Sequence, residues 1–186
     1  KKETLMPFGE YLPFRNILKS IKAIQPLIQN SDYSPGKNDS TFKMANYIVG
    51  NGICLESIYP SHYRKQSLNG ADFLTVVVNN AWFFNSTAAK KHLDMSIMRA
   101  VENNRYMVQA ANTGLSAIIS NKGALIENSN LNQMVLIRNS IKVGLKQSVY
   151  TKYGDVIIML SGTLLLICLL RVLFSKEESA TSQSLE

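Results

Sequence analysis

The feature that most constrains this chain is an uncharged apolar run close to its C-terminus. Residues 156–170 contain no charged side chain, and their only small or weakly polar residues stand at 161–163. As an α-helix, residues 155–174 would be about 28 Å long, close to the ~30 Å hydrocarbon core of a bilayer. A helix buried in a soluble domain usually keeps a polar face. The run therefore predicts a transmembrane helix over 155–174, with a buried C-terminal helix of a soluble domain as the alternative.

The charges that flank this run predict its orientation. Arg171 and Lys176 follow it, and basic residues favour the cytoplasmic side of a membrane. We therefore expect residues 175–186 to form a polar cytoplasmic tail and residues 1–154 to lie on the outer face.

Composition limits the function classes for the rest of the chain. The whole sequence has 46% hydrophobic and 18% charged residues, a composition typical of a globular protein and not of a disordered or fibrous one. Residues 1–154 hold 18 of the 20 Lys and Arg residues but 9 of the 13 acidic ones. This charge suits anionic lipid headgroups as well as nucleic acid, but no dense basic tract is interleaved with aromatics, so no nucleic-acid partner is predicted. Two distant cysteines and two histidines form no disulfide framework or metal motif, and no metal is predicted.

Hydrophobic periodicity predicts a domain in which strands and helices alternate. Residues 14–28 have the pattern of a basic amphipathic helix, which either packs in the core or rests on a bilayer surface. A second helix is expected over 88–103. Strands are expected at 47–54, 73–78, 106–111, 115–120 and 124–126. This alternation predicts an α/β or α+β sheet protein.

Cys54 is the candidate nucleophile because it stands at the end of a predicted strand. A thiol in that place can face substrate while the sheet holds it still. The alternative is a buried, inert cysteine. His92 follows Lys90 and Lys91 on a predicted helix, so a solvated face is expected there and no cysteine–histidine pair is predicted.

Five short blocks, in a characteristic order and spacing, link this candidate nucleophile to a known family. They are Lys2, Pro7–Pro13, Ile53–Glu56, Asn79–Phe83 and Asn112–Gly114. Together they resemble the apolipoprotein N-acyltransferases, a membrane-bound branch of the nitrilase or carbon-nitrogen hydrolase superfamily. The resemblance runs from Lys2 to Asp155, and the segments 31–36 and 99–105 also look like family segments.

The resemblance implies an architecture and a location. Residues 1–154 would form the C-terminal portion of a nitrilase-like α-β-β-α sandwich, incomplete at its N-terminus and followed by one transmembrane helix. The domain would face the periplasm from the bacterial inner membrane. The upstream part of the same enzyme would complete the domain, and no cofactor is implied.

The resemblance also implies a Glu-Lys-Cys catalytic triad. Cys54 matches the cysteine and Lys2 the lysine, whereas the catalytic glutamate would lie upstream of Lys1. Glu10 and Glu56 match further acidic positions around the nucleophile. Trp82 matches an aromatic residue at the substrate entrance. Leu55 and Phe84 depart from the family pattern, which has tyrosine and glycine at those places.

The implied activity is a two-step acyl transfer. Cys54 would take an acyl chain from a phospholipid as a thioester, and the N-terminal diacylglyceryl-cysteine of a lipoprotein would then accept it. Phospholipid, lipoprotein and bilayer are thus the expected partners. The alternatives are an inactive remnant or split-chain fragment of that enzyme, a soluble amidase of the same superfamily, and a basic protein that only binds the membrane surface.

Overall fold

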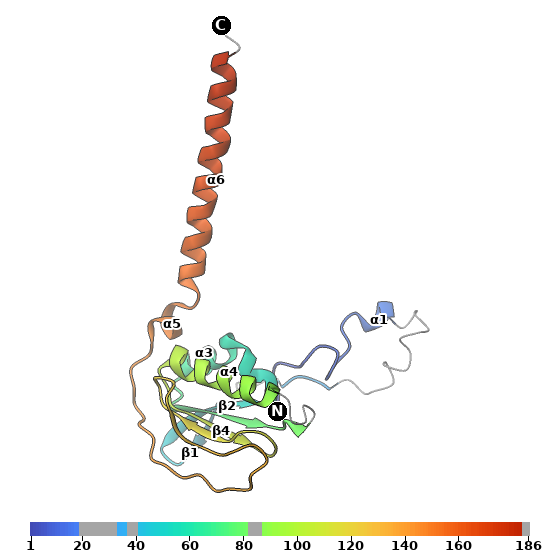
Figure 1. The fold of residues 1–186 in the computed structure, drawn as a ribbon, viewed down its shortest axis with the longest axis vertical. Helices are drawn as coiled ribbons and strands as arrows, with labels where there is room; N and C mark the ends of the chain where they lie inside the picture. Colours follow the sequence, from blue (N-terminus) through green and yellow to red (C-terminus); the bar gives the residue numbers. More distant parts are fainter. Residues whose placement is uncertain (19–32, 37–40, 82–86, 184–186) are drawn as a thin grey trace. The chain divides into compact units, whose positions relative to one another are not determined.

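The structure, a computed structural model, describes residues 1–18, 33–36, 41–81 and 87–183 (Figure 1). It separates into two compact units, Lys1–Thr151 and Lys152–Glu186. The first unit contains a sheet and its helices. The second contains the C-terminal helix α6 (Val156–Gln183).

One six-stranded mixed sheet organises the first unit, and its strand order in space follows the order in sequence. The central strands β2, β3 and β4 are parallel, and the outer strands are antiparallel. Strand β3 coincides with the strand expected over 73–78. The strands are β1 (Thr41–Met44), β2 (Tyr47–Ile53), β3 (Phe73–Val78), β4 (Met107–Ala111), β5 (Ala117–Ile119) and β6 (Leu125–Asn128).

Two helices cover one face of this sheet (Figure 1). They are α3 (Pro60–Leu68), which follows the short 3-10 helix η2 (Cys54–Ile58), and α4 (Ala88–Asn103). Pro60 suits the first turn of α3 because its missing N–H has no partner there in any helix. Asn104 ends α4 in the left-handed conformation that closes many helices. Two further short helices are α1 (Arg15–Leu18) and α5 (Val149–Tyr153).

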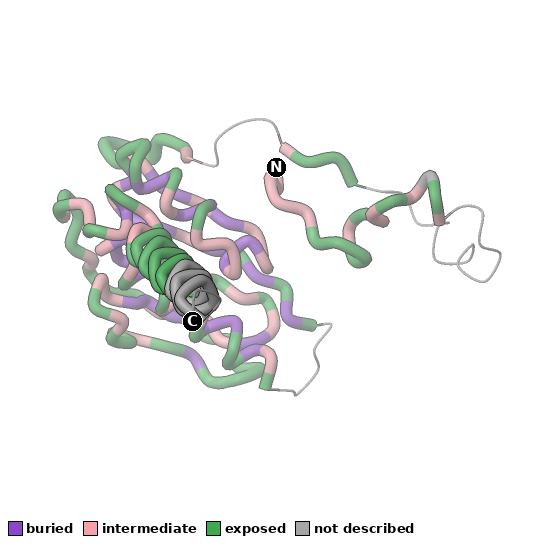
Figure 2. The backbone as a smooth tube through the Cα atoms, turned by 90° about the horizontal axis from the view of Figure 1, so that it is seen from above, coloured by how far each residue is buried: buried purple, intermediate pink, exposed green. Residues whose placement is uncertain are grey.

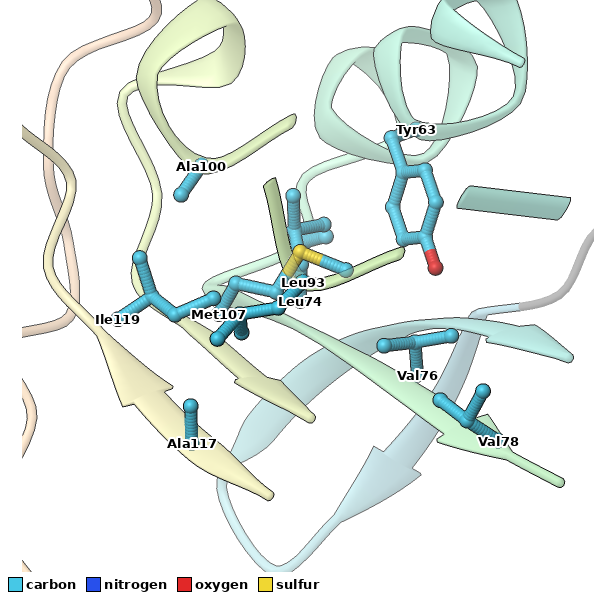
Figure 3. Packing of buried hydrophobic residues seen from close by; sticks show 10 residues of the cluster. Tyr63, Leu74, Val76, Val78, Leu93, Ala100, Met107, Ala117 and Ile119 are labelled. Carbon is cyan, nitrogen blue, oxygen red and sulfur yellow. The ribbon is translucent and has the colours of Figure 1, made fainter. Parts of the chain in front are cut away.

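The main hydrophobic core lies between these two helices and the sheet (Figure 3). Tyr63 of α3 and Leu93 of α4 pack there against Leu74 and Met107 of the central strands. All four side chains are buried, and the buried segments concentrate in the strands and in α3 and α4 (Figure 2). Burying such side chains contributes about 1.5–3 kcal/mol each relative to exposure, so this layer holds the sheet rigid.

Within the described residues, the opposite face of the sheet is covered at one end only. Val49, Phe73 and Tyr106 form a second cluster there, against Ile141 and Leu145 of the irregular segment that follows β6. The same face continues along the strands through other residues. These are Asn51 and Ile53 on β2, Thr75 and Val77 on β3, and Val108 and Ala110 on β4. Val77 is 49% exposed, so the half of this face nearest the carboxyl ends of the strands is open.

Buried Arg105 ties the irregular segment to the sheet. Its Nε donates to the carbonyl of Ala71 at 2.7 Å, and one terminal nitrogen donates to the carbonyl of Lys146 at 3.2 Å. Burial lowers the pKa of this guanidinium, and the nearby Asp72 carboxylate acts in the opposite direction. The contact therefore costs desolvation, which the backbone carbonyls offset by accepting its hydrogen bonds.

The structure confirms an α/β fold with a mixed sheet and the main predicted strands. Of the incomplete α-β-β-α sandwich that was expected, the described residues form one sheet with helices on one face. The predicted helix over 14–28 falls mostly outside the described residues. Helix α3 and strand β1 were not predicted.

Helix α6 contains the apolar run. Its large apolar residues from Ile157 to Val172 are exposed, and the tube has the colour of exposed residues up to the undescribed stretch (Figure 2). Within the described part of the chain, no helix combines the length and the apolarity needed to cross a membrane. The transmembrane assignment of 155–174 stays a prediction.

Candidate active site

The backbone turns sharply at Cys54, at the carboxyl end of β2. Cys54 is half-buried and has φ of 54°, in the left-handed region that non-glycine residues rarely occupy. Such strain persists only where surrounding contacts enforce it, and it concentrates at functional sites. The predicted strand-end position of Cys54 is confirmed.

A close approach between β2 and α3 fixes the strand immediately before this turn. A Cβ atom on Gly52 would lie 2.1 Å from the hydroxyl oxygen of Tyr63, so only glycine fits. Tyr63 is fully buried, and its hydroxyl donates to the carbonyl of Thr75 at 3.2 Å. Burial raises the pKa of Tyr63, and the negative charge of Glu56 adds to the effect. Tyr63 therefore stays protonated and supports the strand.

Glu56 binds the N-terminal segment to the turn. One carboxylate oxygen accepts hydrogen bonds from the backbone N–H groups of Glu3 and Thr4, at 2.7 and 2.8 Å. The other accepts from the N–H of Ile53 at 2.8 Å. Glu56 is only 1% exposed. Glu56 is thus brought to the turn at Cys54, where it holds backbone groups of two segments in place.

Lys2 and Glu10 form an ion pair on the segment that Glu56 holds. The Lys2 Nζ lies 2.7 Å from both carboxylate oxygens of Glu10. Glu10 also accepts the N–H of Met6 at 2.8 Å, which closes the turn between them. A charged hydrogen bond to both oxygens orients the lysine ammonium. Its position is further fixed because the Lys2 carbonyl accepts the N–H of Gly36 at 2.7 Å.

The polar blocks after β3 and β4 meet beside the Cys54 turn. The N–H of Asn80 donates to the carbonyl of Thr113 at 3.3 Å, and that of Asn112 to the carbonyl of Val78 at 3.1 Å. Gly114, with φ of 120°, lies so close to Asn80 that a Cβ there would be 2.6 Å from Asn80 Nδ2. Because β2, β3 and β4 are parallel, their carboxyl ends form one edge of the sheet. The described residues of the blocks that follow β3 and β4 therefore lie together.

His92 was expected on a solvated helix face, and that expectation is wrong. It is 2% exposed, and its Nε2 lies 3.0 Å from the carbonyl oxygen of Cys54. Its Nδ1 lies 3.0 Å from Oδ1 of Asn80. Burial lowers the pKa of His92; its bond to the Cys54 carbonyl raises it, and the Lys2 charge lowers it. A signal was present in the sequence, since His92 adjoins Leu93 on the apolar stripe of the helix.

The remaining predicted site residue, Trp82, lies outside the described residues. A cavity of about 500 Å³ opens beside the segment that carries Lys2. It is lined by Glu3, Thr4, Leu5, Tyr11, Tyr33 and Pro35. Among the residues that the structure describes, no cluster of His, Cys, Asp and Glu has the makings of a metal site.

Comparison with known proteins agrees with this geometry. The family model described as carbon-nitrogen hydrolase matches residues 13–148, which is most of the chain. The chain belongs to the carbon-nitrogen hydrolase family. A solved carbon-nitrogen hydrolase from Helicobacter pylori G27 matches with a TM-score of 0.50 at 13% identity, over 55% of this chain and 43% of that one. This likeness shows the fold.

The proteins that resemble our carbon-nitrogen hydrolase in sequence have a more specific name than the family. The chain is 34% identical to an apolipoprotein N-acyltransferase of Geobacter metallireducens, over 82% of this chain and 29% of the relative. It is 33% identical to an apolipoprotein N-acyltransferase of Rickettsia prowazekii, over 86% of this chain and 32% of the relative. The chain therefore spans about a third of the length of these relatives.

Proposed function

We propose that this chain carries the nucleophile and the lysine of an apolipoprotein N-acyltransferase. The observation that carries the proposal is the strained Cys54 turn, to which Glu56 fastens the segment bearing Lys2. The similarity to apolipoprotein N-acyltransferases over more than four-fifths of the chain selects this activity within the family. The catalytic carboxylate is assigned to the upstream part of the same enzyme.

In the first step, the Cys54 sulfur attacks the ester carbonyl carbon of a phospholipid. A C–S bond forms, the ester C–O bond breaks, and the lysophospholipid leaves as an alcohol. The upstream carboxylate takes the thiol proton and returns it to the leaving oxygen. The Lys2 ammonium faces the negative charge that develops on the carbonyl oxygen, where a fixed cation is more effective than water. Glu10 orients that ammonium.

In the second step, the free amine of a diacylglyceryl-cysteine attacks the thioester. A C–N bond forms, the C–S bond breaks, and the amine proton returns to sulfur through the same carboxylate. Since an amide is more stable than a thioester, the transfer is favourable. Covalent catalysis of this kind lets the two lipid substrates use the site in turn.

A membrane location fits substrates of this kind, and α6 is the proposed anchor. Its described apolar residues surround the helix, so no side of it is suited to water. An enzyme held at headgroup level meets both lipids without extracting them. We assign residues 155–174 to the bilayer, residues 175–186 to the cytoplasm and the sheet unit to the periplasm.

The open half of the sheet face is the proposed contact with the upstream part of the enzyme. Val77 and Ala110 are exposed there on the central strands, whose other face is packed. Apolar faces on central strands normally pack against another layer. A second sheet laid on this face would complete the α-β-β-α sandwich and bring the catalytic glutamate to Cys54.

The test begins with the intact protein, whose N-terminal sequence and mass are measured after purification from its own cells. An upstream extension with a glutamate-bearing segment is expected. Cys54→Ser and Lys2→Ala variants are then assayed with a labelled phospholipid and a diacylglyceryl-cysteine peptide. Loss of both the acyl-enzyme and the amide product is expected in each. Normal acylation by Cys54→Ser would overturn the proposal, and a mature chain that begins at Lys1 and lacks activity would favour the remnant.

A further inference from the structure

His92 links three separate parts of the candidate site. It projects from α4, its Nε2 lies 3.0 Å from the carbonyl of Cys54, and its Nδ1 lies 3.0 Å from the Asn80 amide. Asn80 follows β3 and is 1% exposed, and Gly114 after β4 leaves it the space it occupies. None of the bonds described for Glu56 or Lys2 supports the Cys54 carbonyl. The ring of His92 forms a hydrogen bond with that carbonyl.

The direction of this hydrogen bond does not depend on the charge of the ring. With Asn80 Oδ1 toward Nδ1, both ring nitrogens donate and the imidazole is cationic. With the Asn80 amide reversed, its Nδ2, which is buried without a partner in the present orientation, donates to Nδ1 and the ring is neutral. In both cases Nε2 carries a proton and donates a hydrogen bond to the Cys54 carbonyl. Burial favours the neutral form.

The hydrogen bond from His92 fixes the whole Cys54–Leu55 peptide group as well as the Cys54 carbonyl oxygen. A trans peptide is planar, so the direction of the Cys54 carbonyl sets that of the next N–H, which belongs to Leu55 and points the opposite way. Leu55 is the second residue of η2, where a helix leaves its N–H without an internal partner. Holding the carbonyl toward His92 therefore directs the Leu55 N–H away from the helices. It also holds Cys54 at its unfavourable φ of 54°.

We propose that His92 is a positioning residue that fixes the Cys54–Leu55 peptide plane, and that Asn80 orients its ring for this task. The inference rests on the proposed function, because it assigns a role relative to the Cys54 nucleophile. His92 itself touches neither substrate nor the transferred acyl group. Without it, the peptide is free to rotate, and the thiol and the Leu55 N–H lose their common alignment.

The test compares side chains that keep or remove the donor at the Nε2 position in the intact protein. His92→Leu removes it, and His92→Gln keeps an N–H donor at nearly the same place. Single-turnover formation of the Cys54 acyl-enzyme from a fluorescent phospholipid is measured, together with kcat, KM and the melting temperature. The matched control is Ser96→Ala, one turn along α4, which loses a buried hydrogen bond to Gln109 at 2.6 Å without touching the Cys54 turn.

For His92→Leu we expect acyl-enzyme formation and kcat to fall about 100-fold, the usual scale for a small misplacement of reacting groups, with little change in KM. His92→Gln should recover most of that loss. Ser96→Ala should lower the melting temperature and leave kcat unchanged. A structural role alone would give His92→Leu and Ser96→Ala the same kinetic behaviour, and that result would overturn the inference.

Two controls separate the possible failures. If Cys54→Ser still transfers acyl chains, the proposed function fails whatever His92 does. If Cys54→Ser is inactive and His92→Leu has the wild-type kcat, only the inference fails. If His92→Leu does not fold, Asn80→Ser replaces it: a lowered kcat at constant KM supports the inference, and an unchanged kcat refutes it.

Discussion

Glu56 illustrates, at the scale of the residue, how a charged side chain can be structural within a site. Its two oxygens accept three backbone N–H groups from two segments that are about fifty residues apart. A buried carboxylate without such donors would be strongly unfavourable. The bonds thus explain both its burial and the placement of Lys2. The sequence alone supplied the identity of Glu56 through the family pattern, but not this bonding.

Glu56→Gln should destabilise the protein as well as slow it. The substituted amide presents an NH2 group to backbone N–H donors, so at least one buried hydrogen bond is lost. We expect the free energy of unfolding to fall by about 1–3 kcal/mol, measured by urea denaturation of the intact protein. Asp94→Asn, which neutralises an exposed carboxylate on α4, is the control and should change stability little. Equal stability of the two variants would contradict the bonding described for Glu56.

His92 predicts a pH dependence of stability. Burial lowers its pKa in the folded protein below the ordinary value of 6.5, which the unfolded chain retains. Between the two values the unfolded state binds more protons, so stability rises with pH there. Stability should thus be lost as pH falls below 6.5 toward the folded pKa. Melting temperatures measured from about pH 8 to about pH 5 test this, since His92 titrates in that range.

His92→Gln provides the comparison for this pH effect, because glutamine does not titrate. The variant should lose the decline that begins near neutral pH and keep any decline caused by carboxylates at lower pH. A wild-type and a variant curve with the same shape down to about pH 5 would show that His92 titrates normally in the folded state.

At the scale of the element, the sequence predicted those strands and helices whose apolar residues recur with the spacing of a strand or of a helix. Strand β3 is apolar except for Thr75 and β-branched from Thr75 to Val78, and α4 repeats its apolar residues every four positions. Helix α3 was missed because the side chains it buries include His62, Gln66 and Ser67. Its inner face is thus largely polar, and apolar periodicity is absent. Buried hydrogen bonds, such as that from Gln66 to the Asn51 carbonyl at 2.8 Å, replace it.

The candidate site was predictable only as far as the family pattern carried it. Cys54 was selected from its place at a predicted strand end and again from its block, whereas Lys2, Glu10 and Glu56 were selected only because their blocks match. His92 was missed because the adjacent Lys90 and Lys91 suggested a solvent-exposed helix face. The two lysines in fact lie on the other face of the same helix turn. A buried polar residue is defined by partners distant in sequence, and a single chain read alone does not reveal them.

The contact between β2 and α3 can be tested with one glycine. Gly52→Ala should be strongly destabilising, by about 1–3 kcal/mol, because its Cβ would overlap the Tyr63 hydroxyl in a rigid core. The double variant Gly52→Ala/Tyr63→Phe removes that oxygen and should recover part of the loss. Thermal or urea unfolding of the two variants and of Tyr63→Phe alone gives the coupling. Strictly additive effects would mean that the clash is not with Tyr63.

At the scale of the whole molecule, two apolar surfaces lack cover within the described residues. One is the half-open sheet face around Val77, and the other is the surface of α6. A soluble protein rarely exposes large apolar areas. The two surfaces differ in shape and therefore suit different partners: the flat sheet face suits a second sheet, whereas the apolar helix suits lipid. In the proposed enzyme, the upstream part provides the second sheet and the membrane provides the lipid.

The proposed lipid contact of α6 can be tested by introducing one charge. Leu165→Arg places a guanidinium near the middle of the apolar run, at a cost of about 2.5–3.5 kcal/mol for insertion. The variant should be extracted from membranes by alkaline carbonate more readily than the wild type. Met134→Arg, on a fully exposed side chain of the first unit, is the control and should leave retention unchanged. Equal extraction of all three proteins would contradict a role of α6 in the bilayer.

The match between strand order and sequence order has a consequence for the ribosome-bound chain. Each strand pairs with the strand made just before it, so the sheet can grow one strand at a time as synthesis proceeds. Pairing of strands that follow one another in sequence closes shorter loops than pairing of distant strands would. Residues 41–114 contain Cys54, His92, Asn80 and Gly114, so the nucleophile's surroundings can assemble before the apolar C-terminal helix has left the exit tunnel. The residues around Cys54 and the apolar helix α6 thus emerge from the ribosome at different times during synthesis of the same chain.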